Sequence, residues 1–276
     1  MPADTQVHCD SMPAIAVPRR TLSGAFARMD TALRIATLLF RANLRARHRR
    51  MALGYLWLAI PGAVSALTFA LLRKHALIGT GEVGVPYALF VLSGVFLWQS
   101  LGDGVNVPVQ QLNYQRRFLA IVPAPFQAVL LAALAEALLN LCVRLVILAC
   151  AMLAFGLAPS AAWLAIVACG LTMTLCGFAL SLLVAPFAQL FDDIGSLVAM
   201  AITFGMFVSP VFYPVPAGSL LAASPFAGVL ETARLAIAGT FAPTGLLPAL
   251  ACALLLLVPG WLFNAISRPH IAARAH

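Results

Sequence analysis

Long apolar runs alternate with short polar segments over most of the chain. A helix needs about 20 residues to cross a hydrocarbon core roughly 30 Å thick. Six runs satisfy this requirement, at residues 51–72, 85–105, 126–155, 161–187, 195–213 and 245–266. The pattern predicts an all-α integral membrane protein with six transmembrane helices, which together form a membrane domain over residues 51–266.

A different pattern precedes the first run. Apolar residues recur every three or four positions, which places them on one face of a helix; they are Leu22, Phe26, Met29, Leu33, Ala36, Phe40 and Leu44. The arginines of the segment lie away from that face. Residues 22–50 are therefore predicted to form an amphipathic helix in the membrane interface, with a helix packed on the protein surface as the alternative. The proline-containing residues 1–21 are expected to be a flexible tail.

The stretch 214–243 is apolar but contains four prolines, at 214, 216, 225 and 243. Because proline breaks a straight helix, the stretch is predicted to form two short helices that enter the outer interface and turn back. This re-entrant extracytoplasmic segment precedes the last span. Residues 267–276 are expected to be a short cytoplasmic tail.

Composition and charge agree with a membrane protein. The chain is 62% hydrophobic and 9% charged, whereas soluble domains carry about 25% charged residues, so a soluble enzyme or a nucleic-acid-binding domain is excluded. With the N-terminus inside, thirteen arginines fall on the cytoplasmic side and three basic residues outside. The positive-inside rule then places both termini in the cytoplasm. The basic block before residue 51 is expected to contact anionic lipids.

Motifs for catalysis or cofactor binding are not found. The single lysine, Lys74, is followed by His75, whereas a phosphate-binding loop needs lysine followed by serine or threonine. All five histidines lie outside the predicted spans and no cysteines have metal-ligand spacing, so no catalytic residue, cofactor or metal is expected. Asp192 and Asp193 fit either the start of a helix or the carboxylate pair of a membrane-embedded transferase.

Two charged residues lie within the third span. Glu136 and Arg144 are eight residues apart, which is about 12 Å along a helix and some 80° around it, so a direct ion pair is not expected. Charges at membrane depth face a cavity or a protein partner. The alternatives are a proton relay, a contact with substrate, and a link to another helix.

Aromatic residues cluster in the first, second and fifth spans. They are either interface anchors or lining residues of a passage for sugars, whose C–H faces stack on aromatic rings. The candidates are Tyr55, Trp57, Phe69, Trp98, Phe204, Phe207, Phe212 and Tyr213.

Four local motifs carry a resemblance to a known family. Arg47–Trp57 reads Arg-His-Arg-Arg-Met-Ala-Leu-Gly-Tyr-Leu-Trp, and Glu136 provides an acid in the third span. Ser209–Pro214 reads Ser-Pro-Val-Phe-Tyr-Pro, and Pro225 is followed by Glu231 and Arg234. In this order the motifs resemble the permease subunits of ABC-2 type polysaccharide exporters, which move O-antigen, capsule and teichoic acid chains. Asp192-Asp193 and Ser224 depart from the family, which has Arg-Asp and Asn there.

The resemblance implies a transporter subunit in the bacterial inner membrane that is not itself an enzyme. A homodimer would move a lipid-linked polysaccharide, with O-antigen preferred over capsule or teichoic acid, and ATP would be bound by a separate ATP-binding subunit. Spans one and five would line the passage, and the segment of Pro225, Glu231 and Arg234 would form its outer rim. Residues 22–50 and a loop at Gln111–Val122 would couple to the ATPase through Arg45, Arg47, Arg49, Arg50, Gln115, Arg116 and Arg117. The alternatives are an ABC-2 exporter of small molecules or lipids and a polyprenyl-linked transferase.

Overall fold

A computed structural model describes residues 29–50, 57–75, 84–121, 126–214, 218–219, 221–222 and 224–274. Within these ranges the chain is helical and contains no β-strand. The elements are, in chain order, α2 (Met29–Arg50), α3 (Ile60–Lys74), α4 (Tyr87–Ile121), α5 (Phe126–Ala154), α6 (Trp163–Leu190), α7 (Asp192–Val208), α8 (Pro225–Ile237), the 3-10 helix η3 (Pro243–Leu246) and α9 (Leu247–Arg274).

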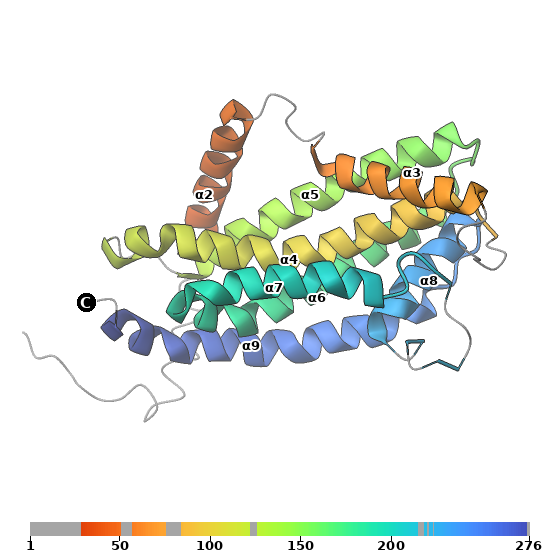
Figure 1. The fold of residues 1–276 in the computed structure, drawn as a ribbon. Helices are drawn as coiled ribbons and strands as arrows, with labels where there is room; N and C mark the ends of the chain where they lie inside the picture. Colours follow the sequence, from red (N-terminus) through yellow and green to blue (C-terminus); the bar gives the residue numbers. More distant parts are fainter. Residues whose placement is uncertain are drawn as a thin grey trace, which may run out of the picture.

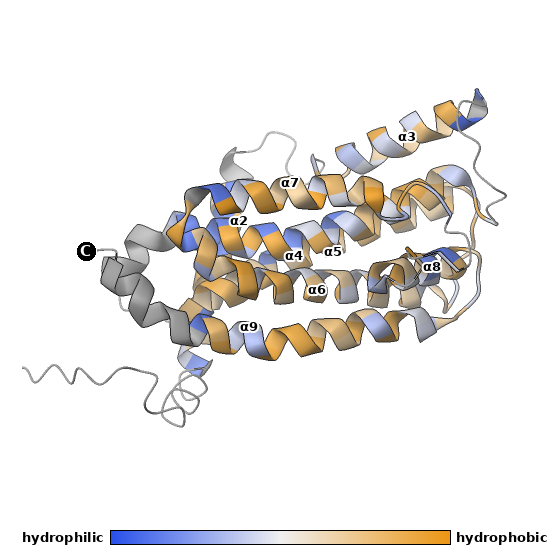
Figure 2. Cartoon of the chain, turned by 60° about the horizontal axis from the view of Figure 1, so that its bottom comes forward, coloured by the Kyte–Doolittle hydropathy of each residue, from blue (hydrophilic) through white to orange (hydrophobic). Residues whose placement is uncertain are grey.

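The long helices form one bundle. In Figure 1, α4, α5, α6, α7 and α9 run side by side, α2 lies at an angle to them near one end, and α8 lies at the other end. These ends are called the α2 end and the α8 end below. The long helices are hydrophobic over most of their length, whereas α2 alternates between hydrophobic and hydrophilic residues (Figure 2).

Within the described residues, four helices are long and apolar enough to cross a membrane. They cover Tyr87–Tyr114, Phe126–Ala154, Trp163–Leu190 and Pro243–Asn264, and so agree with four of the six predicted spans. The other two predictions, 51–72 and 195–213, coincide with the shorter apolar helices Ile60–Arg73 and Asp193–Val208. Residues 51–56 lie outside the described residues. The chain is thus a multi-pass, all-helical membrane protein.

The predicted loop at Gln111–Val122 is wrong, because α4 continues without interruption to Ile121. Hydropathy falls after residue 105, but the helix continues because glutamine, leucine and arginine are good helix formers. Pro108 lies inside this helix.

The α2 helix packs against α5 through alanines. Ala32 and Ala36 of α2 are buried against Ala128 and Ala132 of α5, and small side chains let two helix backbones approach closely. On the predicted apolar face Ala36 is 5% exposed and Leu33 is 48% exposed, and Ala32 beside that face is 1% exposed. Contact with protein, the alternative considered for this helix, is therefore present. Residues 22–28 lie outside the described part of the chain.

The centre of the bundle is the crossing of α4 and α6. A Cβ atom built on Gly177 would lie 2.1 Å from the carbonyl oxygen of Leu101, and one on Gly104 would lie 2.5 Å from that of Thr174. Only glycine permits this approach of two backbones. On the other side of α6, buried Asn264 of α9 donates hydrogen bonds to the carbonyls of Leu182 and Gly260.

Among its described residues, the segment between α7 and α9 contains one α-helix and one 3-10 helix. Ser224 caps α8 by accepting a hydrogen bond from the backbone N–H of Ala227, and Pro225 follows in the first turn, where proline is tolerated. Gly228 of α8 and Gly245 of η3 bring the two backbones together, since a Cβ on Gly245 would lie 2.4 Å from the carbonyl oxygen of Gly228. The last helix, α9, continues to Arg274. Residues 267–274, which were expected to belong to a short tail, are therefore part of this helix.

Candidate functional site

One face of α5 carries three polar residues at intervals of four. Glu136, Asn140 and Arg144 are two helical turns from end to end, and Asn140 and Arg144 are buried at 3% and 4% exposure. Residues four apart lie one above another on a helix surface, so all three can meet the same neighbouring helix. That neighbour is α4.

On α4, Asp103 and Gln111 are also eight residues apart, and the two helices run antiparallel. Asp103 therefore contacts Asn140 and Arg144, which come later along α5. Gln111 contacts Glu136, which comes earlier. Asn140 Nδ2 donates to Asp103 Oδ2 at 2.9 Å, and Gln111 Nε2 donates to Glu136 Oε2 at 2.5 Å. Arg144 Nη1 lies 2.9 Å from Asp103 Oδ2.

The third helix of the site is α2. Arg47 Nη1 donates to Glu136 Oε1 at 3.0 Å and to Asn140 Oδ1 at 3.2 Å. Glu136 thus accepts hydrogen bonds from two helices at once, one on each carboxylate oxygen. Near the last turn of α2, this contact joins the amphipathic helix to the α4–α5 pair.

The six residues form a polar network with no net charge, since Arg47 and Arg144 balance Asp103 and Glu136. The side chains of Arg47, Glu136 and Asp103 are 25%, 21% and 23% exposed. Charges at this depth are costly unless they are paired and hydrogen-bonded. Glu136 accepts from two donors, and Asp103 accepts from Asn140 and forms an ion pair with Arg144. The network therefore stabilises the packing of all three helices.

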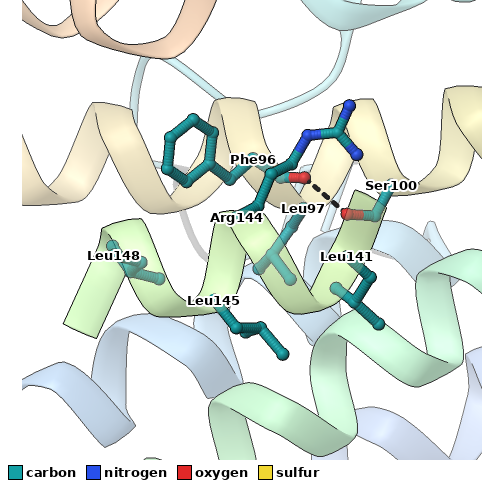
Figure 3. A pocket seen from close by; sticks show the side chains of 7 residues that line it. All are labelled: Phe96, Leu97, Ser100, Leu141, Arg144, Leu145 and Leu148. Atoms are coloured by element: carbon teal, nitrogen blue, oxygen red, sulfur yellow. Dashed lines mark hydrogen bonds between the residues drawn. The ribbon is translucent and has the colours of Figure 1, made fainter. Parts of the chain in front are cut away.

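Arg144 also borders a small cavity between α4 and α5. The cavity is lined mostly by apolar side chains. Figure 3 shows Arg144 reaching across toward α4, where Ser100 donates a hydrogen bond of 2.8 Å to the carbonyl of Phe96. The contact of Arg144 with Asp103 is an ion pair and not an aligned hydrogen bond, because Nη1 has no acceptor in hydrogen-bond geometry.

A second polar cluster lies at the α8 end. Arg234 of α8 is 6% exposed and donates through Nη2 to the backbone carbonyls of Pro210, at 2.6 Å, and Val211, at 3.2 Å. Its guanidinium lies 3.6 Å from the centre of the Phe90 ring. Burial lowers the pKa of Arg234 to about 10 and nearby Glu231 opposes that shift, so the group stays charged at neutral pH. One arginine thereby connects α8 to α4 and to the chain leaving α7.

Aromatic packing continues this cluster toward α3. Tyr87 donates a hydrogen bond of 2.9 Å to the carbonyl of Phe212, and the Arg73 guanidinium lies 4.7 Å from the centre of the Tyr87 ring. The Phe212 ring stacks between those of Phe69 and Phe207, at 4.3 and 5.5 Å. The Ser209–Pro214 motif thus lies where α3, α4, α7 and α8 meet.

The aromatic candidates for a passage divide into two groups. Trp98 and Phe212 are buried at 7% and 6% exposure, and Trp98 donates to the carbonyl of Ile202, so these side chains pack inside the chain. Phe69 and Tyr213 are partly buried beside them. Trp57, Phe204 and Phe207 are 54%, 61% and 55% exposed. Tyr55 lies outside the described residues.

The candidates for coupling are placed less completely. Arg45 is exposed on α2, and Arg47 contacts Glu136 as described. The side chains of Arg49, Arg50, Gln115, Arg116 and Arg117 lie outside the described part of the structure, although their backbones belong to α2 and α4. In the segment predicted to form the outer rim, Pro225 is the first residue of α8. The Glu231 side chain is 62% exposed, and its Oε2 lies 3.7 Å from Arg234 Nη1.

Other predictions concern the chemistry of the site. As expected, Glu136 and Arg144 have different partners and do not pair with each other. Asp192 and Asp193 begin α7, as one of the two interpretations predicted. Among the described residues, no group of three or more His, Cys, Asp or Glu side chains could hold a metal ion. Asp103, Gln111 and Asn140 were not predicted as site residues, although Asp103 is an acid inside the apolar run 85–105, which was a signal for it.

Comparison with known families gives a match over most of the chain. A family model described as ABC-2 type transporter matches residues 35–220, about two thirds of the chain. The matched region contains all six residues of the polar network and ends before α8. No curated protein matches the chain.

Proposed function

We propose that this chain, which belongs to the ABC-2 type transporter family, exports a lipid-linked polysaccharide of the O-antigen type. Its family makes it the membrane-spanning permease component of an ABC exporter. A homodimer of the chain in the bacterial inner membrane would form the passage, with both termini in the cytoplasm. A separate ATP-binding subunit would bind and hydrolyse ATP. The chain itself would carry no cofactor.

The observation that carries the coupling part of the proposal is the link between α2 and the bundle. Arg47 binds Glu136 and Asn140 of α5, and Glu136 binds Gln111 of α4. A force applied to α2 from the cytoplasm therefore reaches two membrane-spanning helices through hydrogen bonds to one carboxylate. This arrangement suits a permease whose movements are driven by nucleotide hydrolysis in another subunit.

Support for a polysaccharide comes from the α8 end. Ser209–Pro214 and the segment of Pro225, Glu231 and Arg234 resemble the exporters of O-antigen chains, and they meet in one cluster through Arg234 and the carbonyls of Pro210 and Val211. Such a cluster fixes α8 against the chain that leaves α7, which suits a rim around an exit. The exposed rings of Trp57, Phe204 and Phe207 offer broad, weakly directional surfaces for sugars.

Deleting the gene tests this function in cells that make the polymer. Export by this permease predicts that completed polymer disappears from the surface and accumulates inside, because synthesis continues while the exit is missing. Immunolabelling of intact and permeabilised cells separates the two locations. Complementation with the wild type and with Cys142→Ala, a change at an exposed cysteine of α5, should restore surface polymer. Polymer on the surface of the deletion strain would contradict the proposal.

A further inference from the structure

The helix α4 is the most buried of the four spanning helices, with 83% of its apolar window inside the protein. Its few accessible positions from the middle of the helix onward are mostly polar and share one face. The members of this polar stripe are Gln99, Asp103, Asn106, Gln110, Asn113 and Tyr114, all intermediate or exposed, with Tyr114 at 85%.

The spacing of the stripe is helical. At 100° per residue its members fall within an arc of about 100°, and from Gln99 to Asn113 the stripe extends about 21 Å along the helix axis. Closer to the α8 end, before the stripe begins, the same face of α4 carries Leu92 and Phe96, which are buried. There α3 covers the helix, and Gly62 of α3 lies against the Phe96 ring. The face is thus apolar where α3 packs on it and polar beyond that point.

Two helices border the stripe. On one side α7 packs on α4, where Gly102 lies against Ile202 and the Trp98 indole donates to the Ile202 carbonyl. On the other side α5 binds Asp103 through Asn140 and Arg144. Amide side chains facing hydrocarbon would leave their donors and acceptors without hydrogen-bond partners, which is strongly unfavourable. The polar stripe is therefore not a lipid-facing surface.

We propose that the polar stripe of α4 is a binding wall of the translocation path, and that its amides hydrogen-bond the hydroxyl groups of a glycan chain. This inference rests on the proposed function and names the site and the ligand chemistry. An amide both donates and accepts, as a sugar hydroxyl does. The single charge of the stripe, Asp103, is already paired with Arg144, so the surface is close to neutral. Each exchange of water for such a bond gains only a small net free energy, which holds a polymer without trapping it.

Cysteine labelling in inverted membrane vesicles tests the exposure of the stripe. In a background with the native cysteines replaced by alanine, Asn106→Cys and Gln110→Cys should react with a charged, membrane-impermeant methanethiosulfonate. Leu254→Cys and Leu255→Cys provide matched controls, because these α9 side chains are 58% and 74% exposed and are expected to face lipid. At least about tenfold faster labelling of the two stripe variants supports the proposal. Equal rates at the four positions would overturn it.

The ligand is tested by comparing vesicles from cells that make the polymer with vesicles from cells that do not. Polymer in the path should slow labelling of Gln110→Cys at least about threefold; no difference overturns the glycan assignment. Efficient disulfide cross-linking between two copies of Asn106→Cys would show that the stripe is covered by a second copy, and this also overturns it. If the deletion strain keeps surface polymer while both stripe variants are still labelled, the proposed function fails and the exposure of the stripe stands.

Discussion

Replacing Glu136 with alanine is expected to lower export at least about tenfold. The carboxylate accepts hydrogen bonds from Arg47 at 3.0 Å and from Gln111 at 2.5 Å, and hydrogen bonds to a charged group contribute about 1.5–3 kcal/mol each. Its removal detaches α2 from α5 at the network and leaves the buried Gln111 amide without its acceptor. Since about 1.4 kcal/mol corresponds to a factor of ten, the loss of either bond is sufficient. Surface polymer per copy of membrane-inserted permease is the measurement.

Cys142→Ala is the matched control for this change. Cys142 lies six residues further along the same helix and is exposed, so its truncation should leave export unchanged. Arg47→Ala should act in the same direction as Glu136→Ala, and exchanging the two charges in Arg47→Glu/Glu136→Arg should recover part of the export. Equal export by the Glu136→Ala and Cys142→Ala variants would show that the carboxylate has no role in coupling.

Gly177→Ala is expected to have the largest effect on stability. The added Cβ would lie 2.1 Å from the carbonyl oxygen of Leu101 and 3.0 Å from the Cα of Gly104, and backbone atoms cannot move aside as a flexible side chain can. Relief requires α4 and α6 to separate at the centre of the bundle, and overpacking typically costs about 1–3 kcal/mol or more. The melting temperature of the purified protein in detergent should fall by at least about 5 °C.

The same substitution at Gly195 provides the comparison. A Cβ there has its nearest neighbour, Val109 Cγ1, at 3.7 Å, which is ordinary contact, so Gly195→Ala should shift the melting temperature by no more than about 1 °C. Both glycines are inside helices, and alanine favours helix by about 1 kcal/mol over glycine at either position. A stable Gly177→Ala protein would mean that α4 and α6 do not cross as closely as described.

Hydropathy predicted the helices best where polar residues are few. The run 126–155 agrees almost residue for residue with Phe126–Ala154, and 161–187 agrees with Trp163–Leu190 to within three residues at each end. It failed at α4, which was expected to end near residue 105 and continues to Ile121. Hydropathy reports which residues tolerate lipid, whereas Gln110, Asn113 and Tyr114 belong to a helix that has a polar face.

The network was only half predictable from the sequence. Glu136 and Arg144 stand out as charges inside an apolar run, and their separation around the helix correctly excluded a direct pair. Their partners did not follow from local spacing, because Arg47 is 89 residues from Glu136 and Asp103 is 41 residues from Arg144. Only the antiparallel packing of α4 on α5 brings Asp103 and Gln111 to one face. The burial of Arg234 was missed for a similar reason, since its partners are backbone carbonyls that a sequence does not distinguish.

Reconstitution with and without an ATP-binding subunit tests most directly whether the chain is a conduit driven by another protein. The purified permease is placed in liposomes and supplied with ATP, first alone and then with its ATP-binding subunit, and phosphate release and polymer transfer are measured. We expect neither activity from the permease alone and both from the pair. ATP-dependent transfer by the permease without a second polypeptide would contradict its assignment as the passive membrane subunit.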